Sequence, residues 1–308
     1  MRIEILGSAA GGGFPQWNCD CRNCHSLRAG TFQGKKRTQT QVAVSQDGHT
    51  WFLLNASPDL RLQIEATPAL HPQTGGRGSP IAGVVLTSAD LDQTVGLLSL
   101  RELQPLRVYC TASIRRILQD DNSVFGMLNR VPSQVVWSEV DLGKKFALIT
   151  SSAEESGIYC EAFSVGTRYP AYVGKRAGAL TAEQASIGLM LSSASGGRLA
   201  YLPAVATLDA SLLERMERAD VLLFDGTFWS EDELIRVQGS GATAAEMGHL
   251  PVSSEHGSLQ RLSGVRRPRK IFVHVNNTNP MLDESGPEYR MLRAAGWELA
   301  EDGWSLET

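Results

Sequence analysis

Long hydrophobic runs are missing from this sequence of 308 residues, and their absence argues against a protein that crosses a membrane. A membrane-spanning helix needs about 20 consecutive apolar residues, and no such run occurs. The first residues, Met1 to Gly7, also lack the apolar stretch of a signal peptide. An excess of basic residues is missing as well, because the formal net charge is −4. We therefore expect neither membranes nor nucleic acids as partners.

Cysteine is scarce and unevenly placed. The chain has five cysteines, an odd number, and three of them are crowded together at Cys19, Cys21 and Cys24. Small secreted proteins held by disulfides usually carry an even set of cysteines. The pattern indicates a reducing compartment, so we expect a cytoplasmic protein with a metal-binding or reactive cluster.

The C-x-C-x-x-C cluster predicts a structural zinc site. Its three thiolates can reach one ion, and Zn²⁺ favours four such ligands in a tetrahedron. The fourth ligand stays open: His25 follows directly but is awkwardly placed, and a residue returning from far along the chain is equally suitable. Residues 14–37 would then form a zinc-binding loop, pinned by the ion because the loop has few apolar residues of its own.

The remaining composition is that of an ordinary globular chain, with 42% hydrophobic and 20% charged residues. Its length is within the range of a single large domain, residues 1–308. Runs of β-forming residues on both sides of Asp47-Gly48 predict a hairpin. A second hairpin is expected from residues 186–191 and 198–203. Further buried strands are expected at residues 81–86, 107–110, 219–224 and 270–273. Antiparallel strands are expected near residues 135–137, 146–149 and 159–163.

Three of the buried strands are followed by residues that can bind metals. The strand at 81–86 leads to Asp90 and Asp92, a later strand ends at Asp225, and another ends at His274. If these strands lie side by side, their polar ends meet at one edge of the sheet and form a site suited to Fe, Mn or Zn. The alternative for each acid is that it only caps the next helix or turn.

His249 differs from the other histidines because it lies in a loop between polar segments. A histidine in such a place could be a general base, a proton donor or an ordinary surface residue.

These features together resemble the metallo-β-lactamase superfamily. The resemblance implies an α+β fold, an αββα sandwich of two mixed β-sheets flanked by helices. Its H-x-H-x-D-H signature falls on residues 88–93, where Ser88, Asp90 and Gln93 replace the three histidines and only Asp92 is retained. Further along the chain, Asp225 matches the superfamily's bridging Asp and His274 its final strand-end His.

The chain resembles the PqqB family of pyrroloquinoline quinone (PQQ) biosynthesis proteins more closely. The matching motifs are spread along the chain, at residues 7–19, 55–60, 224–229, 247–252 and 274–280. The resemblance implies an iron-dependent oxygenase that hydroxylates the tyrosine ring of the PQQ precursor peptide or a later intermediate. A non-catalytic carrier of PQQ or its precursor is the alternative. A metal-dependent hydrolase fits less well, because the signature has lost three histidines. The partner expected is the precursor, an intermediate or PQQ itself, and a homodimer is left open.

The resemblance also assigns roles to the candidate residues. Asp92, Asp225 and His274 would hold Fe(II), with Asp90 or Gln93 nearby. His249 would shuttle protons, orient the phenol or supply a second nitrogen to the metal. An amide at Gln93 is a weaker ligand than imidazole, so metal affinity is predicted to be weakened there.

The zinc loop resembles one in related phosphodiesterases of the superfamily. There the fourth ligand comes three residues after the final strand-end His, a position that is Asn277 in this chain.

Overall fold

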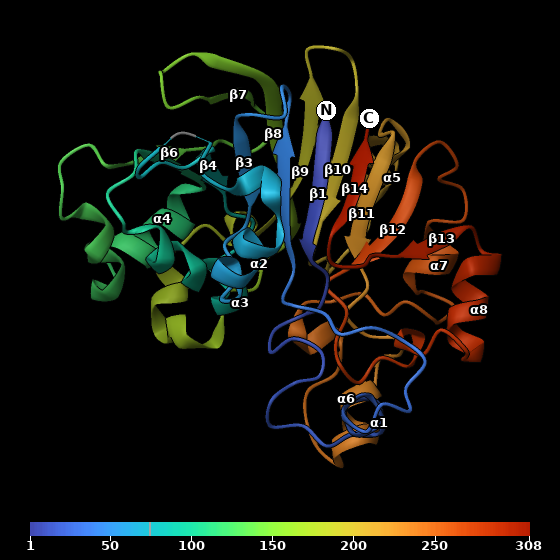
Figure 1. Ribbon diagram of the computed structural model, residues 1–308. Coiled ribbons are helices and arrows are strands. Elements are labelled where there is room, and N and C mark those ends of the chain that lie inside the picture. The colour runs from blue at the N-terminus through green and yellow to red at the C-terminus, as the bar shows by residue number, and fades with distance from the viewer. Residues whose placement is uncertain (74) are drawn as a thin grey trace.

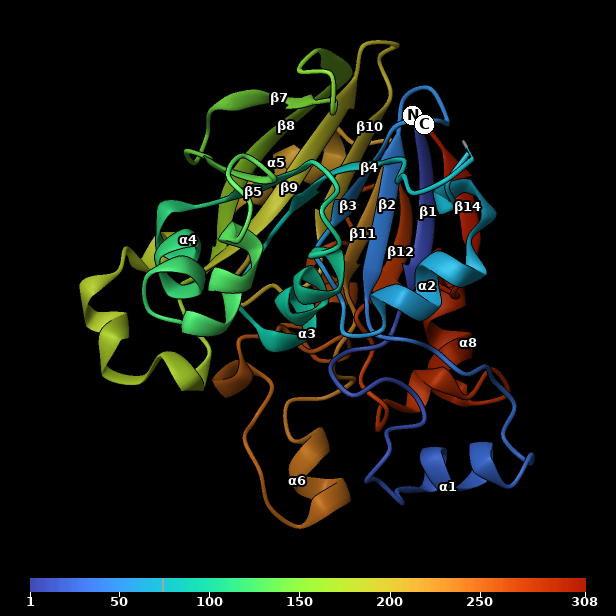
Figure 2. The same cartoon turned by 60° about the vertical axis from the view of Figure 1, so that its left-hand side comes forward.

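The computed structural model describes residues 1–73 and 75–308. Its strands form two seven-stranded mixed sheets, which face each other in Figures 1 and 2. The first sheet has the order β14-β1-β2-β3-β4-β5-β6, and the second has the order β13-β12-β11-β10-β9-β8-β7. The first-sheet strands are β1 (Arg2–Gly7), β2 (Gln41–Ser45), β3 (Trp51–Leu54), β4 (Ile81–Val85), β5 (Leu106–Cys110), β6 (Val135–Glu139) and β14 (Trp304–Glu307). The second-sheet strands are β7 (Lys145–Ile149), β8 (Glu155–Gly166), β9 (Ser186–Ser193), β10 (Arg198–Leu202), β11 (Val221–Asp225), β12 (Arg269–Val273) and β13 (Trp297–Leu299).

Helices cover the outer faces of both sheets, as Figure 1 shows. The first sheet is flanked by α2, α3 and α4, and the second by α5, α7 and α8, whereas α1 and α6 lie below the strand ends. The bounds are α1 (Arg22–Arg28), α2 (Leu60–Ala66), α3 (Leu91–Thr94), α4 (Ala112–Gln119), α5 (Ala210–Glu217), α6 (Glu233–Gln238), α7 (Ser258–Arg261) and α8 (Pro287–Ala294). Within the described residues, no helix has the length and apolar character needed to cross a membrane.

The core follows from the alternation of apolar side chains along the strands. Ile3 and Ile5 of β1 and Leu199 and Tyr201 of β10 belong to one buried cluster between the sheets. The other strand faces pack against the outer helices, as Ile114 of α4 does on the first sheet. Successive side chains of a strand point to opposite faces, so each central strand is buried on both sides. The predicted αββα sandwich is therefore confirmed.

Both predicted hairpins are present. β2 pairs antiparallel with β3, and β9 pairs antiparallel with β10. In the first turn the Asp47 carboxylate accepts hydrogen bonds from the backbone N–H groups of His49 and Thr50, at 2.8 and 2.7 Å. Gly48 has φ +78°, a conformation that glycine adopts without strain.

Two expectations about strand arrangement were wrong. β6 is parallel to β5 in the first sheet, although its alternating sequence suggested an antiparallel strand. The three strands with polar ends do not lie side by side, because β4 is in the first sheet whereas β11 and β12 are neighbours in the second. The polar groups still meet, because the two sheets face each other and their strand ends point to the same end of the sandwich.

Candidate functional site

The strand ends bring a buried group of possible metal ligands together. Asp225 is the last residue of β11, and His274 follows β12 directly. His249 comes from the loop after α6. One ligand atom from each of these three residues lies within 4.8 Å of the others, and all three residues are buried. We call this group the strand-end site.

His274 has an unusual backbone conformation. Its φ is +57°, which few residues other than glycine adopt. Such strain persists only where the surrounding structure enforces it, and it is common at functional sites. Hydrogen bonds from the Ala10 amide to the Val275 carbonyl, and from the Val275 amide to the Ser8 carbonyl, hold the segment in place. His274 thereby lines the cavity at the strand ends.

Asp225 is held in a single orientation. One carboxylate oxygen accepts from the backbone N–H of Val205, at 2.9 Å, and lies 2.8 Å from Nδ1 of His249. The other accepts from the amide and hydroxyl of Thr227, at 3.0 and 2.7 Å. Burial opposes the charge, but His249, His274 and Thr227 hold the pKa of Asp225 below its ordinary value. The group is therefore an ionised carboxylate, as metal ligation requires.

Thr227 sets which nitrogen of His274 is free. Its single hydroxyl proton goes to the ionised Asp225, the strongest acceptor within reach. Nδ1 of His274, 2.8 Å from the same hydroxyl, must then donate to it. The remaining nitrogen, Nε2, faces the cavity and can offer its lone pair to a cation when it holds no proton, an arrangement typical of histidines that bind metals.

Asp92 shows that this corner of the cavity needs a positive charge. Its Oδ2 lies 3.0 Å from Nε2 of His274. Two lone pairs at that distance repel unless a proton or a metal ion lies between them. Burial lowers the pKa of His274, but the hydrogen bond and charge of Asp92 raise it above the ordinary value, which favours a proton on Nε2 when no cation is bound. The residues fit a bound cation, which would replace that proton.

The other candidates after β4 lie close by but do not join the three-residue group. Asp90 accepts from the Ser88 hydroxyl at 2.6 Å, and burial together with the charge of Asp92 raises its pKa. Gln93 is buried, and its amide oxygen accepts from the hydroxyl of Thr87 at 2.6 Å. Asp90, Asp92 and Gln93 therefore form the wall beside the strand-end site.

A cavity of about 670 Å³ opens over the strand-end site. Its wall combines the acids and histidines with aromatic and apolar side chains, which include Tyr172, Phe228 and Met247. The Tyr172 hydroxyl donates to the carbonyl oxygen of Ala89 at 2.6 Å. Such a mixture suits an organic molecule with an aromatic ring and several polar groups.

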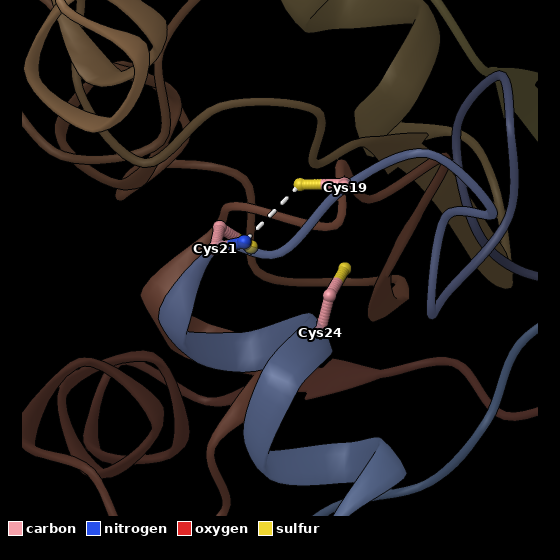
Figure 3. A group of neighbouring side chains, drawn as sticks. All are labelled: Cys19, Cys21 and Cys24. Carbon is pink, nitrogen blue, oxygen red and sulfur yellow. Dashed lines mark hydrogen bonds between the residues drawn. The ribbon is translucent and has the colours of Figure 1, made fainter.

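The three cysteines form a second candidate centre, which we call the cysteine site. Figure 3 shows Cys19, Cys21 and Cys24 with their sulfur atoms turned toward one another at the start of α1. The side-chain amide nitrogen of Asn277 lies 3.2, 3.6 and 3.3 Å from these three sulfurs. Sulfur and oxygen ligands of one tetrahedral Zn²⁺ would be about 3.6 Å apart.

Asn277 is thus placed at the fourth corner of the tetrahedron. A half-turn of its amide would bring the oxygen to this corner as a ligand. His25 is exposed, and its Nδ1 lies 3.1 Å from Asp20 rather than at the sulfurs. The geometry therefore favours Asn277 over His25. Burial and the neighbouring thiols raise the pKa of the Cys21 thiol to about 12, so a thiolate at Cys21 requires a cation beside it.

Some residues of the site could not be identified from the sequence. Thr227, which links Asp225 to His274, is an ordinary turn residue by its local pattern. Asn55 and Thr87, which hold Gln93, come from the ends of β3 and β4 and meet only in the folded chain. The one available signal was that Asn55 and Thr227 fall within motifs that carry the family resemblance.

Comparison with known proteins agrees with this architecture. Residues 50–275 match the family model of the beta-lactamase superfamily domain. A diphosphatase from the PhnP family has a TM-score of 0.66 at 20% identity, over 100% of this chain and 97% of its own, which shows the fold alone.

Relatives with higher identity match over the whole length. Coenzyme PQQ synthesis protein B of Azotobacter vinelandii (strain DJ / ATCC BAA-1303) is 42% identical over 100% of both chains. The protein of that name from Methylobacterium sp. (strain 4-46) is 44% identical over 99% of both. The crystal structure of Zn(2+)-bound PqqB from Methylobacterium extorquens has a TM-score of 0.91, with 41% identity over 100% of both chains. The chain therefore belongs to the coenzyme PQQ synthesis protein B family, within the beta-lactamase superfamily.

Proposed function

We propose that this chain is a non-haem iron oxygenase that hydroxylates the tyrosine ring of the PQQ precursor peptide or of a later intermediate. The observation that carries the proposal is the strand-end site, in which Asp225, His249 and His274 offer one carboxylate and two imidazoles. Two histidines and one carboxylate with open positions are the ligand set of non-haem Fe(II) oxygenases. The residues that follow the strands include only one histidine, His274, and His249 supplies the second nitrogen ligand.

The two candidate sites offer different ligand atoms and therefore suit different metals. The strand-end site has only nitrogen and oxygen donors and opens into the cavity, whereas the cysteine site has three sulfurs and lies in a closed loop. A thiolate site would select zinc and support folding, while the open site leaves room for substrate. Asp225, His249 and His274 would hold Fe(II), which would supply the activation of O₂. In a ring hydroxylation one oxygen atom enters the ring and the other becomes water, with two electrons from a reductant and two protons.

The chain's own residues have three tasks in this reaction. Phe228 and Tyr172 give the substrate ring an apolar surface next to the strand-end site. Asp225 fixes the orientation of His249 through the 2.8 Å contact with Nδ1. Asp90, whose pKa is raised by burial and by Asp92, is the group placed to hold or release a proton near the substrate.

Iron dependence can be tested by loading the same protein with either metal. The Fe(II)-loaded chain with a tyrosine-containing precursor and a reductant is expected to consume O₂ well above background, and the product is expected to gain one oxygen atom by mass spectrometry. The Zn²⁺-loaded chain should be inactive, because zinc undergoes no redox change. Absence of turnover with Fe(II), together with tight binding of PQQ, would favour the carrier function.

A further inference from the structure

Gln93 belongs to the cavity wall and is nearly enclosed. It lies on α3 next to Asp92, and only 2% of its surface is exposed. It lines the cavity over the strand-end site together with His249 and His274. Its backbone is fixed at both ends, because its N–H donates to the Asp90 carbonyl at 3.0 Å and its carbonyl accepts from the Ala56 amide at 2.7 Å. The main chain therefore holds Gln93 in place beside the cavity.

A chain of hydrogen bonds determines which end of the Gln93 amide is already used. The backbone N–H of Thr87 can only donate, so the atom of Asn55 that it reaches at 2.8 Å is the amide oxygen. The nitrogen of Asn55 then donates to the Thr87 hydroxyl oxygen at 2.9 Å. That hydroxyl has its own proton left, and Gln93 at 2.6 Å is a nearer acceptor for it than the Asn55 oxygen at 3.1 Å.

The distance between Thr87 and Gln93 supports this assignment. The two atoms are 2.6 Å apart, which is typical of an O–H···O hydrogen bond and short for N–H···O, whose usual length is about 2.9 Å. The oxygen of Gln93 therefore accepts the Thr87 proton. The amide nitrogen of Gln93 makes no hydrogen bond to any described residue, and it is not completely buried. Because Gln93 lines the cavity, this nitrogen is open to it.

We propose that Gln93 is a substrate-binding residue, whose amide N–H donates to an oxygen atom of the molecule bound beside the strand-end site, and that it is not a metal ligand. The amide oxygen is occupied by Thr87, and an amide nitrogen has no lone pair to offer a metal. The acceptor on the substrate is a phenol, carbonyl or carboxylate oxygen. The inference rests on the proposed function for the identity of the substrate, but the statement about metal binding stands apart from it.

Replacement of Gln93 by methionine tests the proposal, because methionine keeps the length of the side chain and removes the donor. The chain is loaded with Zn²⁺, so that no turnover occurs, and binding of a synthetic tyrosine-containing precursor peptide is measured by calorimetry. The Kd of Gln93→Met is expected to rise by about tenfold, since a buried acceptor loses its partner. The zinc affinity of the strand-end site is expected to stay within about twofold of the native value, because no ligand is lost.

Gln39 offers a matched control in the same cavity wall. Its amide is already used at both ends, by the Gly12 N–H and the Asp59 carboxylate, at 3.0 and 3.1 Å. Gln39→Met should leave peptide binding unchanged. Gln93→Asn, which withdraws the amide by one carbon, serves if the methionine variant does not fold.

Two results would overturn the proposal: unchanged peptide binding by the Gln93 variants, or a large loss of zinc from the strand-end site. A native chain that binds no peptide would instead overturn the substrate proposed above. The zinc affinities of the same variants would still decide whether Gln93 is a metal ligand.

Discussion

Replacement of His274 by asparagine is expected to lower metal affinity at the strand-end site by more than about 100-fold, because the loss of a residue that only supports a ligand already costs 10–100-fold. Turnover with Fe(II) should fall to background for the same reason. Asparagine is chosen because it tolerates the positive φ of +57° at this position better than alanine does. Metal content after dialysis and O₂ consumption are the two measurements.

A milder variant and a control show whether the loss of metal and activity is specific to the strand-end site. Thr227→Val keeps the shape of the side chain but removes the hydroxyl between Asp225 and His274, so metal affinity should fall by about 10–100-fold. His256 is exposed in a loop, and His256→Ala should change neither quantity. Retention of full metal content and activity by His274→Asn would show that the strand-end site does not hold the functional metal.

Replacement of Cys24 by serine is expected to cause the largest loss of stability of any change at the cysteine site. Cys24 is fully buried, and its sulfur lies 3.3 Å from the Asn277 amide. Without the third thiolate the zinc is lost, and the binding energy that fixed this loop is lost with it. We expect a destabilisation on the order of 4 kcal/mol, as for other losses of a structural metal, measured by thermal or urea unfolding.

The control for this prediction is another buried cysteine. Cys110 lies in β5, outside the cysteine site, and burial raises the pKa of its thiol far above the ordinary range. Cys110→Ala should cost about 1 kcal/mol for the lost packing and leave zinc content unchanged. A Cys24→Ser chain that keeps one zinc per chain and its native unfolding temperature would contradict a structural zinc at these cysteines.

Local sequence was sufficient for most of the individual strands. The Asp47-Gly48 turn and the runs of β-forming residues on both sides of it predicted β2 and β3, because strand propensity and turn chemistry are local properties. Sheet membership is not local. β4 is followed by Asp90 and Asp92, and β11 ends at Asp225, but the two strands lie in opposite sheets. β6 pairs parallel with β5, which its own alternation did not indicate.

The same limit applies to the candidate site. Asp225 and His274 could be predicted because each directly ends a buried strand. His249 comes from a loop, so its sequence left its role open between proton transfer and ligation, and the fold brought it within 2.8 Å of Asp225. The orientation of Gln93 depends on Thr87 and Asn55, whose hydrogen bonds exist only in the folded chain.

Anomalous scattering from crystals grown with Zn²⁺ and then soaked anaerobically in Fe(II) tests the two-site account most directly. Data collected at the iron and zinc absorption edges distinguish the two metals at each position. Iron is expected between Asp225, His249 and His274, and zinc between the three cysteine sulfurs and Asn277. Absence of an iron peak at the strand-end site, or iron at the cysteines, would contradict it.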